Sequence, residues 1–146
     1  MRVLLSFVAA TLLLGADAPA EAIKKEMMLL EGEWSMVSGE RDGQKLPDEL
    51  VKTGKRTAKD GETSVSLNDM VFMKAKFTID PSKKPKEIDY TITDGPERGK
   101  TRLGIYEIDG DMVKFCFGAP GDKRPTDFTA KEGSDRTLSV WKRNKK

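Results

Sequence analysis

The chain has 146 residues, of which 34% are charged, but its 26 basic and 24 acidic side chains leave a net charge of only +2. This balance gives no basis for nucleic acid or an anionic membrane as a partner. The sequence contains no histidine and one cysteine, which excludes histidine-dependent catalytic triads, removes the commonest zinc ligand and leaves the fold dependent on its hydrophobic core rather than on disulfides.

The N-terminal residues have the layout of a secretory signal peptide. Arg2 supplies a positive charge, the apolar run 3–14 follows it, and the small-residue stretch 15–22 offers several Ala-x-Ala cleavage sites. The apolar run is too short to span a bilayer, which takes about 20 residues. The sequence therefore predicts export to the periplasm or the extracellular space, with no membrane span in the mature form.

Signal cleavage would divide the chain into two parts. Cleavage is expected after Ala20, with Ala18 and Ala22 as alternatives. Removal of residues 1–20 leaves residues 21–146, which are enough for one domain with a hydrophobic core and too few for two. We therefore predict a signal peptide followed by a single domain.

Two short helices and one strand are predicted at the start of this domain. Apolar side chains at helical spacing indicate a helix over 23–31, and a strand over 33–41 follows it. One face of that strand is expected to carry Trp34, Met36 and Ser38. The Asp-Gly pair at 42–43 is typical of a hairpin turn, and residues 47–53 have the pattern of one or two helical turns.

The rest of the domain has the pattern of short strands and turns. Asp-Gly pairs at 60–61 and 109–110 predict two further hairpins. Alternating apolar and polar residues predict half-buried strands over 71–80 and 87–93. The inward residues of the first of these are expected to be Val71, Met73, Ala75, Phe77 and Ile79. The last two predicted strands are 127–130 and 136–143.

About eight or nine antiparallel strands with regular spacing are typical of a sandwich or a closed barrel, and a barrel is favoured because it leaves no exposed edge. The hairpin at 100–118 has apolar residues on both faces. A strand that is apolar on both faces is covered on both. We expect the N-terminal helix or a second subunit to supply the outer cover.

The segment Gly32-x-Trp34, which follows the predicted helix and opens the first strand, is similar to the Gly-x-Trp signature of lipocalins. In that family the tryptophan closes one end of a β-barrel, and a basic residue of the last strand lies over it. The resemblance implies this covering role for Arg143, or alternatively for Lys142. The chain departs from lipocalins in its shorter length and in its lack of a disulfide.

A longer set of segments resembles an uncharacterised family of small exported domains, lipocalin-like in fold, that is abundant in planctomycete bacteria. These segments follow one another along nearly the whole predicted domain. The resemblance implies the fold and export, and it brings no activity with it. The segments are LEGEW at 30–34, DPSKKPKEID at 80–89, TDGP at 93–96, GIYE at 104–107, DGD at 109–111, CF at 116–117 and RPTDF at 124–128.

No catalytic or metal-binding constellation stands out, and no cofactor is implied. Cys116 lies between two phenylalanines in a strand, which favours a buried, unreactive thiol over a nucleophile. Asp109 and Asp111 lack the further oxygen ligands of a calcium loop and fit a hairpin turn. A carboxylate pair such as Asp89 and Asp94 is what a glycosidase needs, but the sequence gives no separation between them.

Arg124 lies in a loop rich in glycine and proline, and two interpretations stay open for it. An arginine held in a stiff loop can bind a carboxylate or phosphate with two hydrogen bonds. The alternative is a structural arginine that pairs with backbone carbonyls or with Asp127.

The leading functional hypothesis is a non-enzymatic, lipocalin-like module that binds a small apolar or amphipathic ligand at the barrel mouth. The residues expected to contact the ligand are Tyr106, Phe117 and Arg124. The residues expected to be structural are Gly32, Trp34 and Arg143. One alternative is a cell-envelope module whose hairpin at 100–118 docks a protein partner or a second copy of the chain. Another is a hydrolase that relies on carboxylates.

Overall fold

Nine strands and two short helices make up the part of the chain that this computed structural model describes, residues 18–145. The predicted signal peptide over 1–20 therefore lies almost wholly outside the described residues. None of the helices in the described part is long and apolar enough to cross a membrane. The elements are α1 (Ala20–Leu30), β1 (Gly32–Arg41), β2 (Gln44–Lys45), α2 (Asp48–Val51), β3 (Lys55–Lys59), β4 (Glu62–Leu67), β5 (Met70–Asp80), β6 (Lys86–Asp94), β7 (Thr101–Asp109), β8 (Met112–Phe117) and β9 (Thr137–Arg143).

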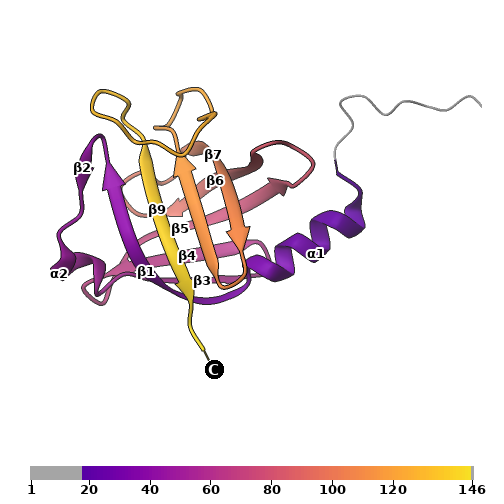
Figure 1. Cartoon of the computed structure of the whole chain (residues 1–146), viewed down its shortest axis with the longest axis horizontal. Coiled ribbons are helices and arrows are strands. Elements are labelled where there is room, and N and C mark those ends of the chain that lie inside the picture. Colours follow the sequence, from indigo (N-terminus) through magenta and orange to yellow (C-terminus); the bar gives the residue numbers. More distant parts are fainter. Residues whose placement is uncertain (1–17, 146) are drawn as a thin grey trace, which may run out of the picture.

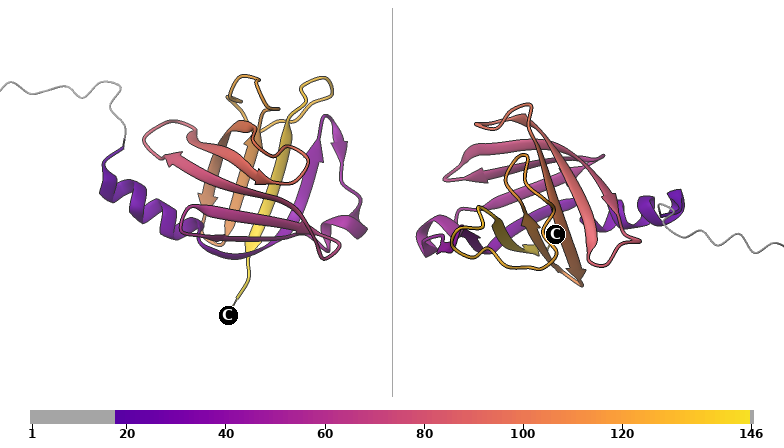
Figure 2. Two further views of the ribbon diagram at one scale, coloured as in Figure 1. Left: turned by 180° about the vertical axis from the view of Figure 1, so that it is seen from behind. Right: turned by 90° about the horizontal axis from the view of Figure 1, so that it is seen from above.

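The strands form one antiparallel sheet that closes into a barrel (Figure 1). Strands β3 to β9 pair in chain order, and β1 pairs with β3 on one side and with β9 on the other. The two-residue strand β2 adds to the far half of β1, beyond the point where β1 parts from β3. Figure 2 shows the same closed sheet from behind and from above. The predicted mainly antiparallel barrel with a short N-terminal helix is confirmed.

Tight turns at two of the predicted Asp-Gly pairs fix the register of their hairpins. Asp42 and Gly43 have φ of 49° and 82°, and Asp60 and Gly61 have φ of 51° and 76°. Two successive residues with positive φ are typical of the type I′ turn, whose twist matches that of the flanking strands. The β3–β4 pairing that follows from the second turn joins Lys59 to Glu62.

β-bulges change the face that two strands present, and two predicted orientations are wrong for this reason. In β1 the pairing with β9 shifts between Met36 and Ser38, so Ser38 is exposed and does not share the face of Trp34. In β5 the pairing with β4 shifts near its start, and Val71 is 52% exposed instead of inward. An extra residue in one strand reverses the alternation beyond it, and no composition signal marks that position.

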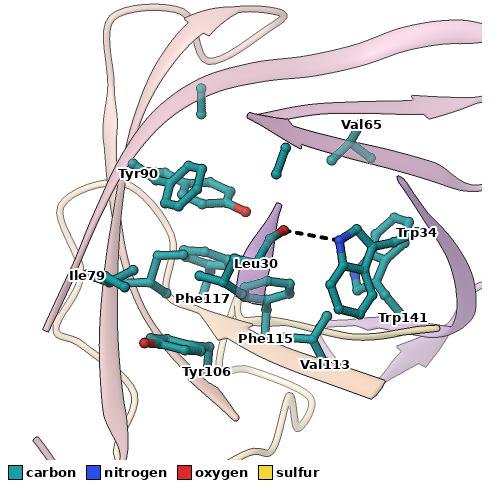
Figure 3. Packing of buried hydrophobic residues seen from close by; sticks show 14 of the residues in the cluster. Leu30, Trp34, Val65, Ile79, Tyr90, Tyr106, Val113, Phe115, Phe117 and Trp141 are labelled. Atoms are coloured by element: carbon teal, nitrogen blue, oxygen red, sulfur yellow. Dashed lines mark hydrogen bonds between the residues drawn. The ribbon is translucent and has the colours of Figure 1, made fainter. Parts of the chain in front are cut away.

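The barrel interior is packed at the end where β1 begins. Leu30, the last residue of α1, is 1% exposed and plugs this end together with Trp34. The indole Nε1 of Trp34 donates a hydrogen bond of 3.1 Å to the carbonyl of Leu30 (Figure 3). Ile23 and Met27 of α1 pack against the same core. Because the buried side chains of a helix lie three or four residues apart, α1 can seal the barrel with one face.

Arg143 of β9 covers this plug from outside. Its guanidinium carbon lies 4.2 Å from the centre of the Trp34 ring, and it donates hydrogen bonds to the carbonyls of Leu29 (2.5 Å) and Glu31 (2.8 Å). Gly32 has φ of +119°, a conformation that glycine adopts without strain. Of the two basic residues of the last strand considered for this position, Arg143 is the one that lies over the Trp34 ring.

The outer face of the β7–β8 hairpin is covered by the chain's own segment 119–136. Ile105 and Cys116 on that face are buried, and the Cys116 thiol donates a hydrogen bond to the carbonyl of Thr129. The expectation that α1 or a second subunit supplies this cover is therefore corrected. The predicted strand over 127–130 is also wrong, because β8 pairs directly with β9 and leaves no place for it in the sheet.

Candidate functional site

A cavity of about 340 Å³ lies in the barrel at the end opposite to the Leu30 plug. Its walls come from β1 and from β3 to β9, and the segment holding β2 and α2 covers the wedge where β1 leaves β3. Most of the wall is apolar. The apolar side chains that line it include Met36, Leu50, Val65, Met73, Ile92 and Phe117. The volume falls at the lower end of the range of small-molecule sites in proteins.

Arg56 lies at the floor of this cavity and is 2% exposed. In the sheet it stands between Trp34 of β1 and Val65 of β4, so its side chain enters the interior directly above the plug. Its Nη1 donates a hydrogen bond of 2.5 Å to the hydroxyl of Tyr90, and its guanidinium carbon lies 4.1 Å from the centre of the Phe115 ring. The floor is thus a cation held between aromatic groups.

The guanidinium of Arg56 is incompletely paired. Its Nε and Nη2 are buried and have no hydrogen-bond partner among residues 18–145, and no carboxylate in that part of the chain forms an ion pair with it. A buried cation without a counter-charge costs several kcal/mol even after relaxation, and the aromatic contacts return about 2 kcal/mol. The arrangement therefore favours the arrival of an anion at these two nitrogens.

Tyr90 adds a neutral donor beside this cation. Its side chain points into the barrel in Figure 3, and the centroid of its ring lies 4.2 Å from the centroid of the Phe117 ring. Burial raises the pKa of the Tyr90 hydroxyl, outweighing the opposite effect of the nearby Arg56 charge. The hydroxyl therefore keeps its proton, accepts from Arg56 and has its own O–H available for a further acceptor.

A second arginine of the cavity wall is fully engaged, in contrast to Arg56. Arg102 donates to both carboxylate oxygens of Glu97 at 2.9 and 3.0 Å, and to the carbonyl of Gly118 at 3.3 Å. This bidentate pair neutralises its charge where it stands. Of the two buried arginines that line the cavity, Arg102 is therefore satisfied and Arg56 is not, and the third arginine of the lining, Arg41, is exposed.

The three residues predicted to contact a ligand do not lie together. Phe117 lines the cavity. Tyr106 is buried at the α1 end, where its hydroxyl lies 3.2 Å from Oε1 of Glu26, a carboxylate that Lys86 pairs at 2.6 Å. Desolvation, together with the charge of Glu26, strongly raises the pKa of Tyr106, so it is a protonated structural group there.

Arg124 lies on the outside of the barrel and ties the 119–136 segment to β6 and β7. It donates to the carbonyls of Gly104 (2.8 Å) and Ile88 (3.2 Å), and its Nη2 lies 2.7 Å from the carboxylate of Asp89. Of the two interpretations that the sequence left open, the structural arginine agrees with these contacts, although the carboxylate is that of Asp89 and not of Asp127. Asp127 is paired with Arg136 instead.

The remaining candidates from the sequence occupy structural positions. The Cys116 thiol is buried beneath the 119–136 segment, and this burial raises its pKa, which disfavours the reactive thiolate. Asp89 is held by Arg124, and Asp94 accepts a hydrogen bond from the backbone N–H of Gly95. Within residues 18–145 no cluster of three acidic or cysteine side chains is placed to hold a metal ion.

Sequence analysis did not single out Arg56, although β3 carries a signal for it. Lys55, Thr57 and Lys59 are exposed, so the alternation of the strand places Arg56 and Ala58 inward. An arginine at an inward position of a half-buried strand marks either an internal ion pair or a ligand contact. The signal was hidden because its neighbours are also basic and the strand has no apolar stripe.

Comparison with known proteins adds no family or function to this geometry. No protein-family model, no curated protein and no solved structure matches the chain.

Proposed function

We propose that this protein is an exported, non-enzymatic module that binds a small apolar or amphipathic ligand inside its barrel. The observation that carries the proposal is the cavity of about 340 Å³, whose wall is mainly apolar and which lies at one end of a barrel that is packed at the other. An apolar cavity with a few polar groups is typical of small-molecule sites. What supports export is the sequence pattern of residues 1–20.

The wall side chains explain why a ligand would prefer the cavity to water. Removal of apolar surface from water contributes roughly 25 cal/mol per Å². The side chains of Met36, Met73 and Leu50 are flexible enough to adjust to different shapes. The alternative is that the β7–β8 hairpin docks a partner. It is less well supported, because segment 119–136 covers the apolar residues Ile105 and Cys116 on the outer face of that hairpin.

Titration with N-phenyl-1-naphthylamine, a neutral dye that fluoresces in apolar surroundings, tests the proposal. We expect saturable binding of one dye per chain, and organic extraction of the purified protein should release a co-purified amphiphile detectable by mass spectrometry. Leu67→Trp places a larger side chain in the cavity wall, and it should weaken dye binding about tenfold or more.

Val37→Trp is the matched control, since Val37 is exposed on the outside of β1. It should leave dye affinity unchanged. Equal affinity in the wild type and in Leu67→Trp would place the dye elsewhere on the protein and contradict the proposal. Absence of dye binding to the wild type would contradict it as well.

A further inference from the structure

Resting on the proposed ligand-binding function, we propose that the ligand is an amphipathic monocarboxylate whose carboxylate pairs with Arg56 at the floor of the cavity and whose apolar part points toward the mouth. Two nitrogens of Arg56, Nε and Nη2, have no hydrogen-bond partner among the described residues. They belong to a side chain that is 2% exposed and lines the cavity. A buried donor with no partner is rare in proteins and calls for an acceptor.

The position of these nitrogens selects the chemical class of the acceptor. Nε and Nη2 form one edge of the planar guanidinium, and two parallel N–H groups on one edge match the two oxygens of a carboxylate. The third nitrogen, Nη1, is already used by Tyr90. A carboxylate brings one negative charge, which balances the one unpaired cation of the floor. A doubly charged phosphate would bring a surplus charge into an apolar wall, which is costly.

Tyr90 reinforces this choice. Its hydroxyl accepts from Arg56 and remains protonated, because burial raises its pKa. The hydroxyl holds Nη1 on the far side of the guanidinium, which leaves the Nε–Nη2 edge for the carboxylate and its two hydrogen bonds. A cationic or neutral head group offers no comparable match, because the floor presents donors and a positive charge.

The depth of Arg56 sets the direction of the ligand. Arg56 stands beside Trp34 above the plug, whereas Leu46, Leu50 and Phe72 line the cavity nearer its mouth. A ligand whose carboxylate reaches Arg56 must therefore extend its apolar part along the wall toward these side chains. A medium-chain fatty acid has a carboxylate and an apolar chain that can lie in this direction.

Isothermal titration of the full chain with decanoate, decan-1-ol and decyltrimethylammonium tests the inference. Decanoate should bind most tightly. Arg56→Met should weaken decanoate binding about 10- to 100-fold, as expected for the loss of charged hydrogen bonds, and should leave decan-1-ol affinity within about threefold of the wild type. Arg56→Lys keeps the charge without the two-nitrogen edge, and should recover part of the loss.

Arg98→Met is the matched control, because Arg98 is an exposed arginine in the loop before β7 and loses the same charge. It should leave decanoate affinity unchanged. If decan-1-ol binds the wild type as tightly as decanoate, or if Arg56→Met keeps decanoate affinity while it still binds N-phenyl-1-naphthylamine, the carboxylate inference is overturned and the cavity function stands. If neither the dye nor any of the three decyl probes binds, both proposals fall.

Discussion

At the scale of single residues, Arg56 is a buried cation with two unpaired nitrogens, an arrangement that is costly for folding. The core around it consists of aromatic and aliphatic side chains, and the one hydrogen bond that it forms within residues 18–145 goes to Tyr90. Replacement of buried ionic groups by apolar groups of similar volume is often neutral or stabilising by 1–4 kcal/mol, whereas removal of one partner alone is destabilising. A folding requirement alone therefore gives no reason for an arginine at this position.

A double-mutant cycle of Arg56 and Tyr90 in the ligand-free protein tests this cost. Tyr90→Phe should lower the free energy of unfolding by about 2 kcal/mol, because Arg56 then loses its last hydrogen-bond partner. Arg56→Met combined with Tyr90→Phe should be at least as stable as the wild type, because both polar groups leave the core together. Urea unfolding measures all four proteins. Additive losses, with the double variant the least stable, would contradict the description of Arg56 as an uncompensated cation.

The role of a single residue can be predicted from sequence where a short local motif marks it. Trp34 and Arg143 could be predicted because Gly32-x-Trp34 is a short pattern at the start of a strand, and the resemblance supplied a partner on the last strand. The chemistry of Tyr106 and Arg124 makes them candidate ligand contacts, but in the structure their partners are Glu26 and Asp89. Arg56 could not be placed in a cavity from sequence, because its partners Tyr90 and Phe115 come from distant strands.

At the scale of elements, segment 119–136 contains no helix or strand, and it covers the outside of the barrel over β6 to β8. Arg124 fastens its first part to β6 and β7, and the carbonyl of Ala130 accepts a hydrogen bond from Gly43 in the β1–β2 turn. Beneath it lie Ile105 and Cys116, which would otherwise be exposed apolar groups on the sheet. The segment therefore lets the β7–β8 hairpin be apolar on both faces without a partner protein.

The single cysteine reports on the attachment of this segment. Cys116 should react slowly with 5,5′-dithiobis(2-nitrobenzoic acid) in the native protein, because burial blocks access and raises the thiol pKa. Arg124→Met removes the hydrogen bonds to Gly104 and Ile88 and should raise the labelling rate about tenfold through local opening. The neighbouring exposed Lys123 supplies the control Lys123→Met, which should label at the wild-type rate. Equal rates in all three proteins would mean that Arg124 does not hold the segment closed.

Elements were predictable wherever the signal lies in a few consecutive residues. The hairpin at 60–61 was found from its Asp-Gly pair, and the β3 and β4 bounds follow from it. The bulges in β1 and β5 were missed because they depend on pairing between strands. The false strand at 127–130 has apolar alternation for another reason, since Phe128 and Ala130 are wholly or partly buried as parts of the covering segment.

At the scale of the whole molecule, the two ends of the barrel differ in chemistry and in packing. One end is sealed by α1, Leu30 and Trp34, with Arg143 fastened over them. The other end holds the cavity, and the side chains around its mouth include the exposed Phe72 and the half-buried Leu50. β1 and β9 pair from Trp34 to Arg41 and so close the wall at both ends, whereas side chains fill the interior only at the α1 end. Adjustment to a ligand is therefore expected at the mouth.

Hydrogen exchange with and without decanoate tests this division. A concentration of one hundred times the dissociation constant should raise the free energy of unfolding by about 2.7 kcal/mol, which slows those amides that exchange through global unfolding. Amides that exchange through local opening should be slowed only where the ligand contacts the chain, near α2 and the start of β5. The exchange rates of the amides in the first turns of α1 should be unchanged. Slowing confined to α1 would place the ligand at the sealed end and contradict the assignment of the mouth. Arg56→Met at the same decanoate concentration should keep only about 1.4 to 0.4 kcal/mol of this stabilisation, as follows from 10- to 100-fold weaker binding, because its cavity remains while its counter-charge for the carboxylate is gone.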